Sequence, residues 1–400
     1  MRLAGLLFLI FIAAGVQGQI FLSEEAEISV VTLGPYQGEP WSAFGHNGFR
    51  VKDPVRGIDW FYDYGLYDFN QENFFLNFAK GLLKYRVGVR TWERTLAFQK
   101  RLNRYIKLQY LNLTRAEKQQ LFNFLQNNVR PENAEYLYHY IYDNCATKIR
   151  DVVHDQFSGR IEFNLSYVKE ERTIRQLMDE FLGQQAWGDF GIDISLGLEI
   201  DRVTQPEEYM FLPFYVHKAF AGATIERDDR KYPLVKSSID VFIPEKESSL
   251  SVLIKPFNLF LILFFVVGLI THRNLKFEKR TKWVDAFLFG FAGFVGLWLV
   301  YLWFGTEHMS KNNLNILWAI PLHLPIFFML WKKEWLVFFQ KYFLITGVWY
   351  SILLIIWAIL PQPLHQALVP FVLAMLLRAL YLSYYFRRLV KKSLKDTMNT

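Results

Sequence analysis

Long apolar runs fill residues 251–400 of this 400-residue chain. A helix needs roughly 20 apolar residues to cross the hydrocarbon core of a bilayer. In that core every backbone polar group must be bonded within the protein, so such runs are expected to fold as helices. We predict spans at residues 252–271, 284–304, 314–331, 336–360 and 366–386. The sequence therefore predicts an all-α membrane domain with five transmembrane helices.

Lysine and arginine alternate between the loops that join these spans. The basic groups follow the first span, the third span and the last one: Arg273, Lys276, Lys279, Arg280 and Lys282; Lys332 and Lys333; Arg387, Arg388, Lys391, Lys392 and Lys395. The second loop has only Lys311, and the fourth ("PQPLHQ") has none. Because basic loops stay in the cytoplasm, we expect a basic cytoplasmic tail and an outward-facing N-terminal part. The formal charge of +7 then reflects orientation and contact with membrane lipids, and it does not indicate a nucleic-acid partner.

The first 18 residues, "MRLAGLLFLIFIAAGVQG", combine Arg2, an apolar core and small residues before a cut after Gly18. This pattern is typical of a secretory signal peptide; a first transmembrane helix is the alternative, but the apolar run is short. Residues 19–250 have a mixed, charged composition and the size of one exported soluble domain.

The exported domain is predicted to mix strands and helices. Strand-like alternation occurs at residues 26–34, 47–53, 57–65 and 135–142, and helical spacing at 118–129 and 146–157. Thr114 and Glu117 form a capping box ahead of the first of these helices. The sequence therefore predicts an α+β domain.

Cys145, in "HYIYDNCATKIRDV", is the only cysteine. One cysteine cannot form an internal disulfide, so it is an intermolecular partner, a buried small side chain or a reactive thiol. It follows Asp143 and Asn144, which are favoured helix caps, and opens a predicted helix. The free N–H groups there stabilise a thiolate and can bind an oxyanion, to which the Asn144 side chain could add a donor. This position favours a reactive thiol.

A nucleophilic cysteine needs a base, most often histidine. His46, in "PWSAFGHNGFRV", lies at a predicted strand edge between Gly45 and Gly48, which permit close approach. His139 is too near Cys145 in sequence to reach it easily, and His154 lies too far along the helix. His46 is the best candidate, although a lone histidine is more often an ordinary polar residue. The chain has neither a glycine-rich phosphate loop nor a metal-spaced His/Cys motif, so no cofactor or metal is predicted.

Several motifs together resemble a known family. "WSAFGHNGFRV", "FYDYGLYDF", "YDNCATKIRDVV", "WGDFGIDISLGLEIDR" and "YMFLPFYV" are similar to the exported domain of lipoprotein N-acyltransferases of Bacteroides-type bacteria. That domain was formerly classed as a family of unknown function, and the attached membrane helices also fit the group. More distantly, the order His-then-Cys resembles permuted papain-like hydrolases and acyltransferases, including the lecithin:retinol acyltransferase group. The resemblance implies a permuted papain-like α+β domain followed by the all-α multi-span membrane domain.

The same resemblance assigns site residues. It implies that His46 is the base and Cys145 the nucleophile, with an orienting group on the strand after His46. That strand offers Asp59, Asp63 and Tyr64, of which we prefer Asp63. Two further residues, Trp41 and Ser42, are expected to shape the pocket, with a role in packing as the alternative, and Asn144 is expected to face the oxyanion.

By this resemblance the chain is an acyltransferase of the bacterial inner membrane whose catalytic domain faces the periplasm. It would move an acyl chain from a phospholipid, through a thioester on the cysteine, to the α-amine of a diacylglyceryl-cysteine lipoprotein. The alternatives are a membrane-anchored papain-like thiol peptidase or cell-wall amidase, a lipid hydrolase, and a non-enzymatic assembly protein.

His323, in "PLHLP" of the third predicted span, has two interpretations. An ionisable group inside a membrane is a functional candidate by default. Two flanking prolines equally indicate a broken helix with a satisfied polar side chain.

Overall fold

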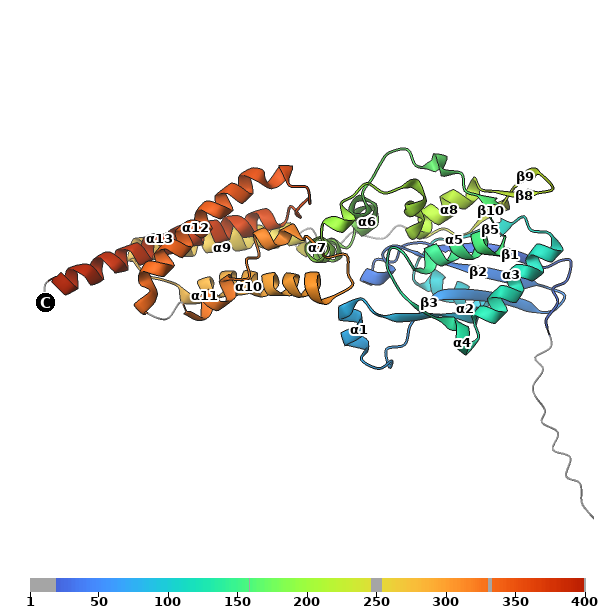
Figure 1. The fold of residues 1–400 in the computed structure, drawn as a ribbon, viewed down its shortest axis with the longest axis horizontal. Helices are drawn as coiled ribbons and strands as arrows, with labels where there is room; N and C mark the ends of the chain where they lie inside the picture. Colours follow the sequence, from blue (N-terminus) through green and yellow to red (C-terminus); the bar gives the residue numbers. More distant parts are fainter. Residues whose placement is uncertain (1–18, 158, 246–253, 330–332, 399–400) are drawn as a thin grey trace, which may run out of the picture.

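The computed structural model describes residues 19–157, 159–245, 254–329 and 333–398. The predicted signal peptide and the predicted domain boundary at residue 250 lie outside these ranges. An α+β domain and a bundle of long helices lie end to end, and the C-terminus is at the far end of the bundle (Figure 1). The predicted α+β domain followed by an all-α region is therefore confirmed, and the permuted papain-like type of the domain stays a prediction.

The domain is built on a seven-stranded antiparallel sheet with the order β10-β5-β1-β2-β3-β4-β6, beside a smaller sheet β7-β8-β9. The strands are β1 (Glu27–Leu33), β2 (His46–Asp53), β3 (Ile58–Leu66), β4 (Lys84–Thr91), β5 (Ile106–Leu111), β6 (Glu135–Leu137), β7 (Ile161–Glu162), β8 (Thr224–Arg227), β9 (Arg230–Pro233) and β10 (Val235–Phe242). The first three predicted strands are confirmed. The fourth was predicted too long, because His139 and Asp143 exchange backbone hydrogen bonds that close a turn after Leu137.

Helices surround the large sheet. They are α1 (Phe74–Lys80), α2 (Trp92–Arg101), α3 (Arg115–Asn128), α4 (Pro131–Ala134), α5 (Cys145–Gln156), α6 (Ile174–Leu182), α7 (Ala186–Ser195) and α8 (Pro213–Ala221), with 3₁₀ turns η1 (Pro40–Ser42), η2 (Leu165–Tyr167), η3 (Leu198–Ile200) and η4 (Pro206–Phe211). Both predicted helices are present. Thr114 and Glu117 form both halves of the predicted capping box at the start of α3.

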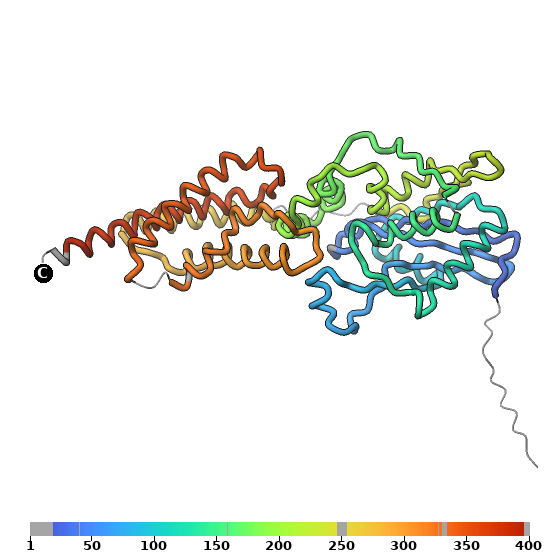
Figure 2. The backbone as a smooth tube through the Cα atoms, viewed as in Figure 1, coloured from blue at the N-terminus to red at the C-terminus, as the bar shows by residue number. Residues whose placement is uncertain are grey.

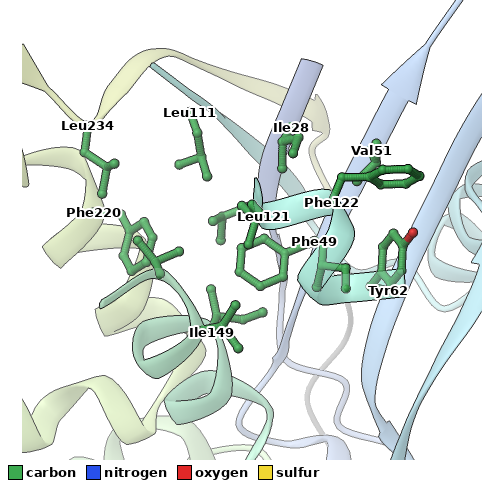
Figure 3. Packing of buried hydrophobic residues seen from close by; sticks show 14 of the residues in the cluster. Ile28, Phe49, Val51, Tyr62, Leu111, Leu121, Phe122, Ile149, Phe220 and Leu234 are labelled. Carbon is green, nitrogen blue, oxygen red and sulfur yellow. The ribbon is translucent and has the colours of Figure 1, made fainter. Parts of the chain in front are cut away.

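The main core lies between the sheet and helices α3, α5 and α8 (Figure 3). Alternation along each strand sends every second side chain to this face. The sheet contributes Ile28, Phe49, Val51 and Tyr62. Helix α3 contributes Leu121 and Phe122, α5 contributes Ile149, and α8 contributes Phe220. Burying each large apolar side chain contributes about 1.5–3 kcal/mol. This packing fixes α5, and with it the helix start that carries Cys145, against strands β2 and β3.

Among the described residues of the C-terminal region, four helices are long and apolar enough to cross a membrane. The elements are α9 (Pro256–Phe277), α10 (Lys282–Gly305), η6 (Leu314–Leu317), α11 (His323–Met329), η7 (Lys333–Trp335), α12 (Leu336–Ile356), η8 (Trp357–Ile359) and α13 (Leu368–Met398). The predicted third span, at residues 314–331, is not one continuous helix over the part that the structure describes. There the chain forms η6, an irregular stretch and the short helix α11.

This third segment is interrupted at Pro321, which lacks the backbone N–H that a helix interior requires. It still runs along α10, because glycines on that helix permit backbone contact. A Cβ on Gly293 would lie 2.3 Å from the Leu324 nitrogen, and one on Gly296 would lie 2.1 Å from the Ala319 oxygen. Small residues commonly allow such close approach between membrane segments.

His323 is fully buried at this interruption. Its Nδ1 and Nε2 atoms lie 2.6 Å from the hydroxyl oxygens of Tyr342 and Tyr350, respectively, and Tyr350 also donates to the Trp318 carbonyl. The structure therefore agrees with the second interpretation, a broken segment whose polar side chain is satisfied.

The ends of the bundle differ in what they contact. The loops after α10 and after η8 hydrogen-bond the α+β domain, for example from Glu307 to Lys80 and from Gln362 to Leu196. The turn after α9 lies at the opposite end, where Glu278 pairs with Arg388 on the distal part of α13. The alternation of basic residues between loops therefore agrees with the structure, because the loops poor in lysine and arginine lie at the end of the bundle that faces the α+β domain.

Candidate active site

Cys145 is the first residue of α5, as predicted. The cap is Asn144, whose Oδ1 accepts from the backbone N–H groups of Ala146 and Thr147 at 2.8 and 3.0 Å. Its Nδ2 donates to the carbonyls of Tyr140 and Phe211 at 2.8 and 3.0 Å, and the residue is only 4 % exposed. The expectation that Asn144 donates to an oxyanion is therefore wrong, because both amide hydrogens already have acceptors. Asn144 instead positions the helix start.

His46 and Cys145 meet across the interface between β2 and α5. Burial raises the pKa of the Cys145 thiol, but the positive charge of His46, the hydrogen bond to its ring and one from the backbone N–H of Asn47 lower it below the ordinary value. Conversely, burial lowers the pKa of His46, but the charges of Cys145 and Asp63 raise it to about 10. The pair therefore favours a thiolate beside an imidazolium at neutral pH.

Asp63 is the strand residue that reaches His46. Its Oδ1 lies 2.8 Å from His46 Nε2 and accepts the Gly65 backbone N–H, also at 2.8 Å. Burial raises the pKa of Asp63, but the positive charge of His46 and these hydrogen bonds lower it overall. Because Asp63 engages Nε2, the Nδ1 side of the ring is left for Cys145.

The two other candidates on β3 have different partners. Asp59 accepts two hydrogen bonds from Arg50 at 2.7 and 2.8 Å, and the Tyr64 hydroxyl donates to Asn128 at 2.8 Å. Of the three side chains considered from the sequence, Asp63 is thus the one placed to orient His46.

The pocket residues expected before His46 lie on η1. Trp41 is 59 % exposed, and the Ser42 hydroxyl lies 3.4 Å from a Glu39 carboxylate oxygen. In the described part of the domain, no hydrogen bond or ring contact joins either residue to Cys145 or His46. Their assignment to the pocket stays a prediction.

Arg104, between α2 and β5, is a residue that the sequence reasoning missed. It is 5 % exposed; its Nε donates to the Gly34 carbonyl, and its Nη2 has no partner among the described residues. Burial lowers the pKa of Arg104 to about 10, although the negative charges of Cys145, Tyr105 and Asp63 act to raise it. A buried guanidinium with an unused donor therefore lies within the electrostatic reach of the thiol. Nothing in "RLNRYIKL" indicates this, because an arginine there reads as a surface residue.

Gly65 is a second missed residue. A Cβ at this position would lie 2.5 Å from His46 Cε1, so only glycine leaves room for the imidazole. A glycine inside a strand pattern often marks such a close approach, and this was the available signal in "FYDYG".

The thiol-bearing segment is bonded to the membrane region. The Met309 backbone N–H, in the loop after α10, donates to the Tyr140 hydroxyl at 3.2 Å. The Tyr140 carbonyl in turn accepts from Asn144, which caps the helix of Cys145. Cys145 therefore lies two hydrogen bonds away from a loop that connects membrane helices.

One group of possible metal ligands forms at the junction with the bundle. Asp189 and Asp193 on α7 and His365 before α13 bring ligand atoms within 4.8 Å of one another. Sequence spacing could not reveal this cluster, because His365 is distant in the chain. Arg175 already binds Asp193 Oδ1 at 2.7 Å and Asp201 at 2.7 Å, so the cluster is part of an ion-pair network. A metal would have to compete with that guanidinium.

Fold and site together define a class: an α+β domain with a partly buried Cys-His-Asp cluster, joined to a helical region suited to a membrane. Residues 23–180 match the family model described as the Lnb N-terminal periplasmic domain, and residues 245–389 match the Lnb transmembrane domain. The chain is thus an Lnb-family membrane protein with a periplasmic domain. No curated protein and no solved structure matched it.

Proposed function

We propose that the protein is a lipoprotein N-acyltransferase of the bacterial inner membrane that works through a thioester on Cys145. The observation that carries the proposal is the Cys145–His46–Asp63 cluster at the start of a helix that is bonded to a membrane loop. A thiolate at a helix N-terminus beside a histidine is an activated nucleophile for acyl groups. Because the proposed acyl donor is a lipid of the bilayer, a thiol fixed beside the membrane helices lies within reach of that donor.

In the first half-reaction the Cys145 thiolate attacks an ester carbonyl of a phospholipid. The carbon–sulfur bond forms, the ester carbon–oxygen bond breaks, and the His46 imidazolium protonates the departing lysophospholipid oxygen. Asp63 keeps the imidazole ring oriented. The Cys145 N–H, which has no acceptor within the described residues, can donate to the tetrahedral oxyanion. The unused Arg104 donor offers positive charge to an anionic oxygen of the substrate.

In the second half-reaction the free α-amine of a diacylated lipoprotein attacks the thioester. The amine proton passes to His46, the thiolate leaves, and an amide remains on the lipoprotein. Water competes for the same thioester, so a transferase must position the amine and exclude water.

The test uses purified protein with phospholipid and a diacylated lipopeptide. We expect N-acylated lipopeptide and lysophospholipid in matched amounts, and an acyl adduct on Cys145 by mass spectrometry when the acceptor is omitted. Cys145→Ala is the control. Cys145-dependent release of free fatty acid with the lipopeptide amine unchanged would replace the proposal by a lipid hydrolase. Absence of any adduct would exclude thioester chemistry.

A further inference from the structure

Residues 67–82, between β3 and β4, form an excursion that we call the aromatic loop; it contains α1. Its large apolar side chains point outward: Phe69, Phe75, Leu76, Phe78 and Leu82 are all exposed, Phe75 at 81 %. Of the four phenylalanines in this loop, only Phe74 is buried, and it packs against Tyr67, Phe69 and Phe78. A contiguous exposed apolar patch of this kind marks a surface that contacts another apolar phase.

The aromatic loop is attached to the domain-side end of α10. The Glu307 N–H donates to the Lys80 carbonyl at 2.8 Å, and His308 Nε2 lies 3.2 Å from the Phe78 carbonyl. Gly81 ends α1 with φ +75°, and a Cβ there would lie 3.3 Å from the His308 nitrogen. The backbone trace shows the loop beside the end of α10 (Figure 2). The loop is therefore held at the level where the chain leaves the membrane.

The surroundings of the aromatic loop match a bilayer surface. The last turn of α10 carries Trp303 and an exposed Phe304, whose rings stack, so the apolar surface of the membrane helix continues toward α1. Aromatic side chains are enriched at this depth of a membrane. Lys80, at the end of α1 within the loop, provides positive charge for lipid phosphates, whereas Lys84, just after the loop, pairs with Glu135.

A cavity of about 430 Å³ lies between the aromatic loop and β4. Charged residues of both signs line it together with Tyr67 and Tyr85: the carboxylates Asp68, Glu72 and Glu135 and the cations Lys84 and Arg86. It therefore combines charges of both signs, which suit a zwitterionic phospholipid headgroup such as that of phosphatidylethanolamine, with the aromatic base of the loop.

Tyr85, which lines the cavity, contacts the chain segment that leads to Cys145. The Tyr85 ring stacks on Tyr138 at 4.0 Å between centroids. Burial and then the charge of Cys145 raise the pKa of Tyr138. Burial, followed by the charges of Tyr67 and Cys145, also raises the pKa of Tyr85. A row of tyrosine rings, Tyr67, Tyr85 and Tyr138, thus leads from the aromatic loop to the segment that precedes Cys145.

We propose that the aromatic loop inserts into the outer leaflet of the membrane and presents phospholipid to Cys145 along the Tyr67–Tyr85–Tyr138 row. Insertion stands independently of the activity. Delivery of the acyl donor rests on the proposed acyltransferase function.

Insertion is tested without catalysis. In a Cys145→Ala background the chain has no cysteine, so Phe75→Cys can be labelled at one site with a polarity-sensitive fluorophore. We expect a blue-shifted probe in phosphatidylethanolamine–phosphatidylglycerol proteoliposomes, quenched by lipids with spin labels on the acyl chain. The matched control is Val55→Cys, 67 % exposed in the turn at the other end of β2 from His46, which should stay unquenched. An aqueous, unquenched probe at residue 75 would overturn the proposal.

Delivery is tested by the Phe75→Ser, Phe78→Ser double variant, with Val55→Ser as control. We expect transfer from vesicle phospholipid to fall at least about tenfold, because two aromatic anchors are lost. Transfer from detergent-solubilised phospholipid should stay within about twofold of the unsubstituted protein, since the Cys145 site is unchanged. An equal loss of acyl transfer from both donors, or no loss of transfer from vesicle phospholipid, would overturn the proposal that the aromatic loop delivers phospholipid to Cys145. If the unsubstituted protein transfers nothing, the acyltransferase function fails, while the quenching result still decides insertion.

Discussion

Replacing Gly65 by alanine tests whether the orientation of His46 decides the reactivity of Cys145. Gly65 lies two residues after Asp63, and its N–H binds the same carboxylate oxygen that holds His46. A Cβ there would lie 2.5 Å from His46 Cε1 and 3.2 Å from Nδ1, whereas ordinary contact begins at 3.4 Å. The imidazole must therefore retreat by roughly 1 Å, on the side of the ring left for the thiol.

A displacement of roughly 1 Å between catalytic groups can cost about 100-fold in rate. That corresponds to a barrier higher by about 2.7 kcal/mol. The fold should be preserved, because Gly65 is not among the glycines with positive φ and alanine can adopt its backbone conformation. We therefore expect a fully folded Gly65→Ala protein whose acyl transfer is slower by about two orders of magnitude.

Two measurements check this expectation. One is acyl transfer from phospholipid to lipopeptide, and the other is the rate of Cys145 alkylation by iodoacetamide against pH. The alkylation midpoint should move upward, since the positive charge of His46 lies farther from the thiolate. Gly183→Ala is the matched control, because its backbone is helical and a Cβ there meets nothing within 4 Å. Unsubstituted rates and an unchanged midpoint in Gly65→Ala would refute the reasoning.

Further predictions concern the pair itself and the topology. Cys145→Ala and His46→Ala should each abolish acyl transfer, and the double variant should be hardly worse, because the two act as a unit; additive losses in the purified proteins would argue against a pair. Alkylation of Cys145 should reach half its maximum below the ordinary thiol pKa of about 8.5. His46→Ala should raise that midpoint, since burial then acts without the opposing charge; a midpoint that stays put would remove His46 as the cause. Reporter fusions at residue 308 should be active only on the outer side and those at Lys395 only in the cytoplasm, and the reverse would invert the topology.

Local patterns explain what the sequence predicts well. β2 and β3 form a hairpin, so His46 and Asp63 come together through a register in which Gly48 faces Asp63. The start of α5 depends on the cap at Asn144, which is also local. The candidate nucleophile, base and orienting carboxylate therefore fall on elements whose positions alternation and capping indicate.

What the sequence did not indicate depends on contacts between distant segments. The amide hydrogens of Asn144 are taken up partly by Phe211, which is 67 residues away. Arg104 reaches the site by bonding Gly34, 70 residues before it. Hydropathy also cannot distinguish a continuous helix from the broken third segment, because both are apolar throughout, and the packing of Ala319 and Leu324 on α10 glycines appears only in three dimensions.

The junction between domain and bundle gives the site a fixed position relative to the membrane helices. The last carbonyls of a helix lack partners within it. At the end of α7 the bundle supplies them: Asn315 donates to the Asp193 carbonyl at 2.9 Å, Asn313 to that of Ile194 at 2.6 Å, and Gln362 to that of Leu196 at 3.0 Å.

Loss of an amide donor costs about 1–3 kcal/mol where it leaves the buried carbonyl without another partner, whereas the Leu196 carbonyl would keep Arg175 as a donor at 3.2 Å. The two parts therefore fold as a unit at this junction, and side-chain packing sets the height of the nucleophile above the membrane helices. For a thiol whose proposed donor and acceptor both reside in the bilayer, such a fixed height turns two-dimensional diffusion of lipid into encounters at a positioned site.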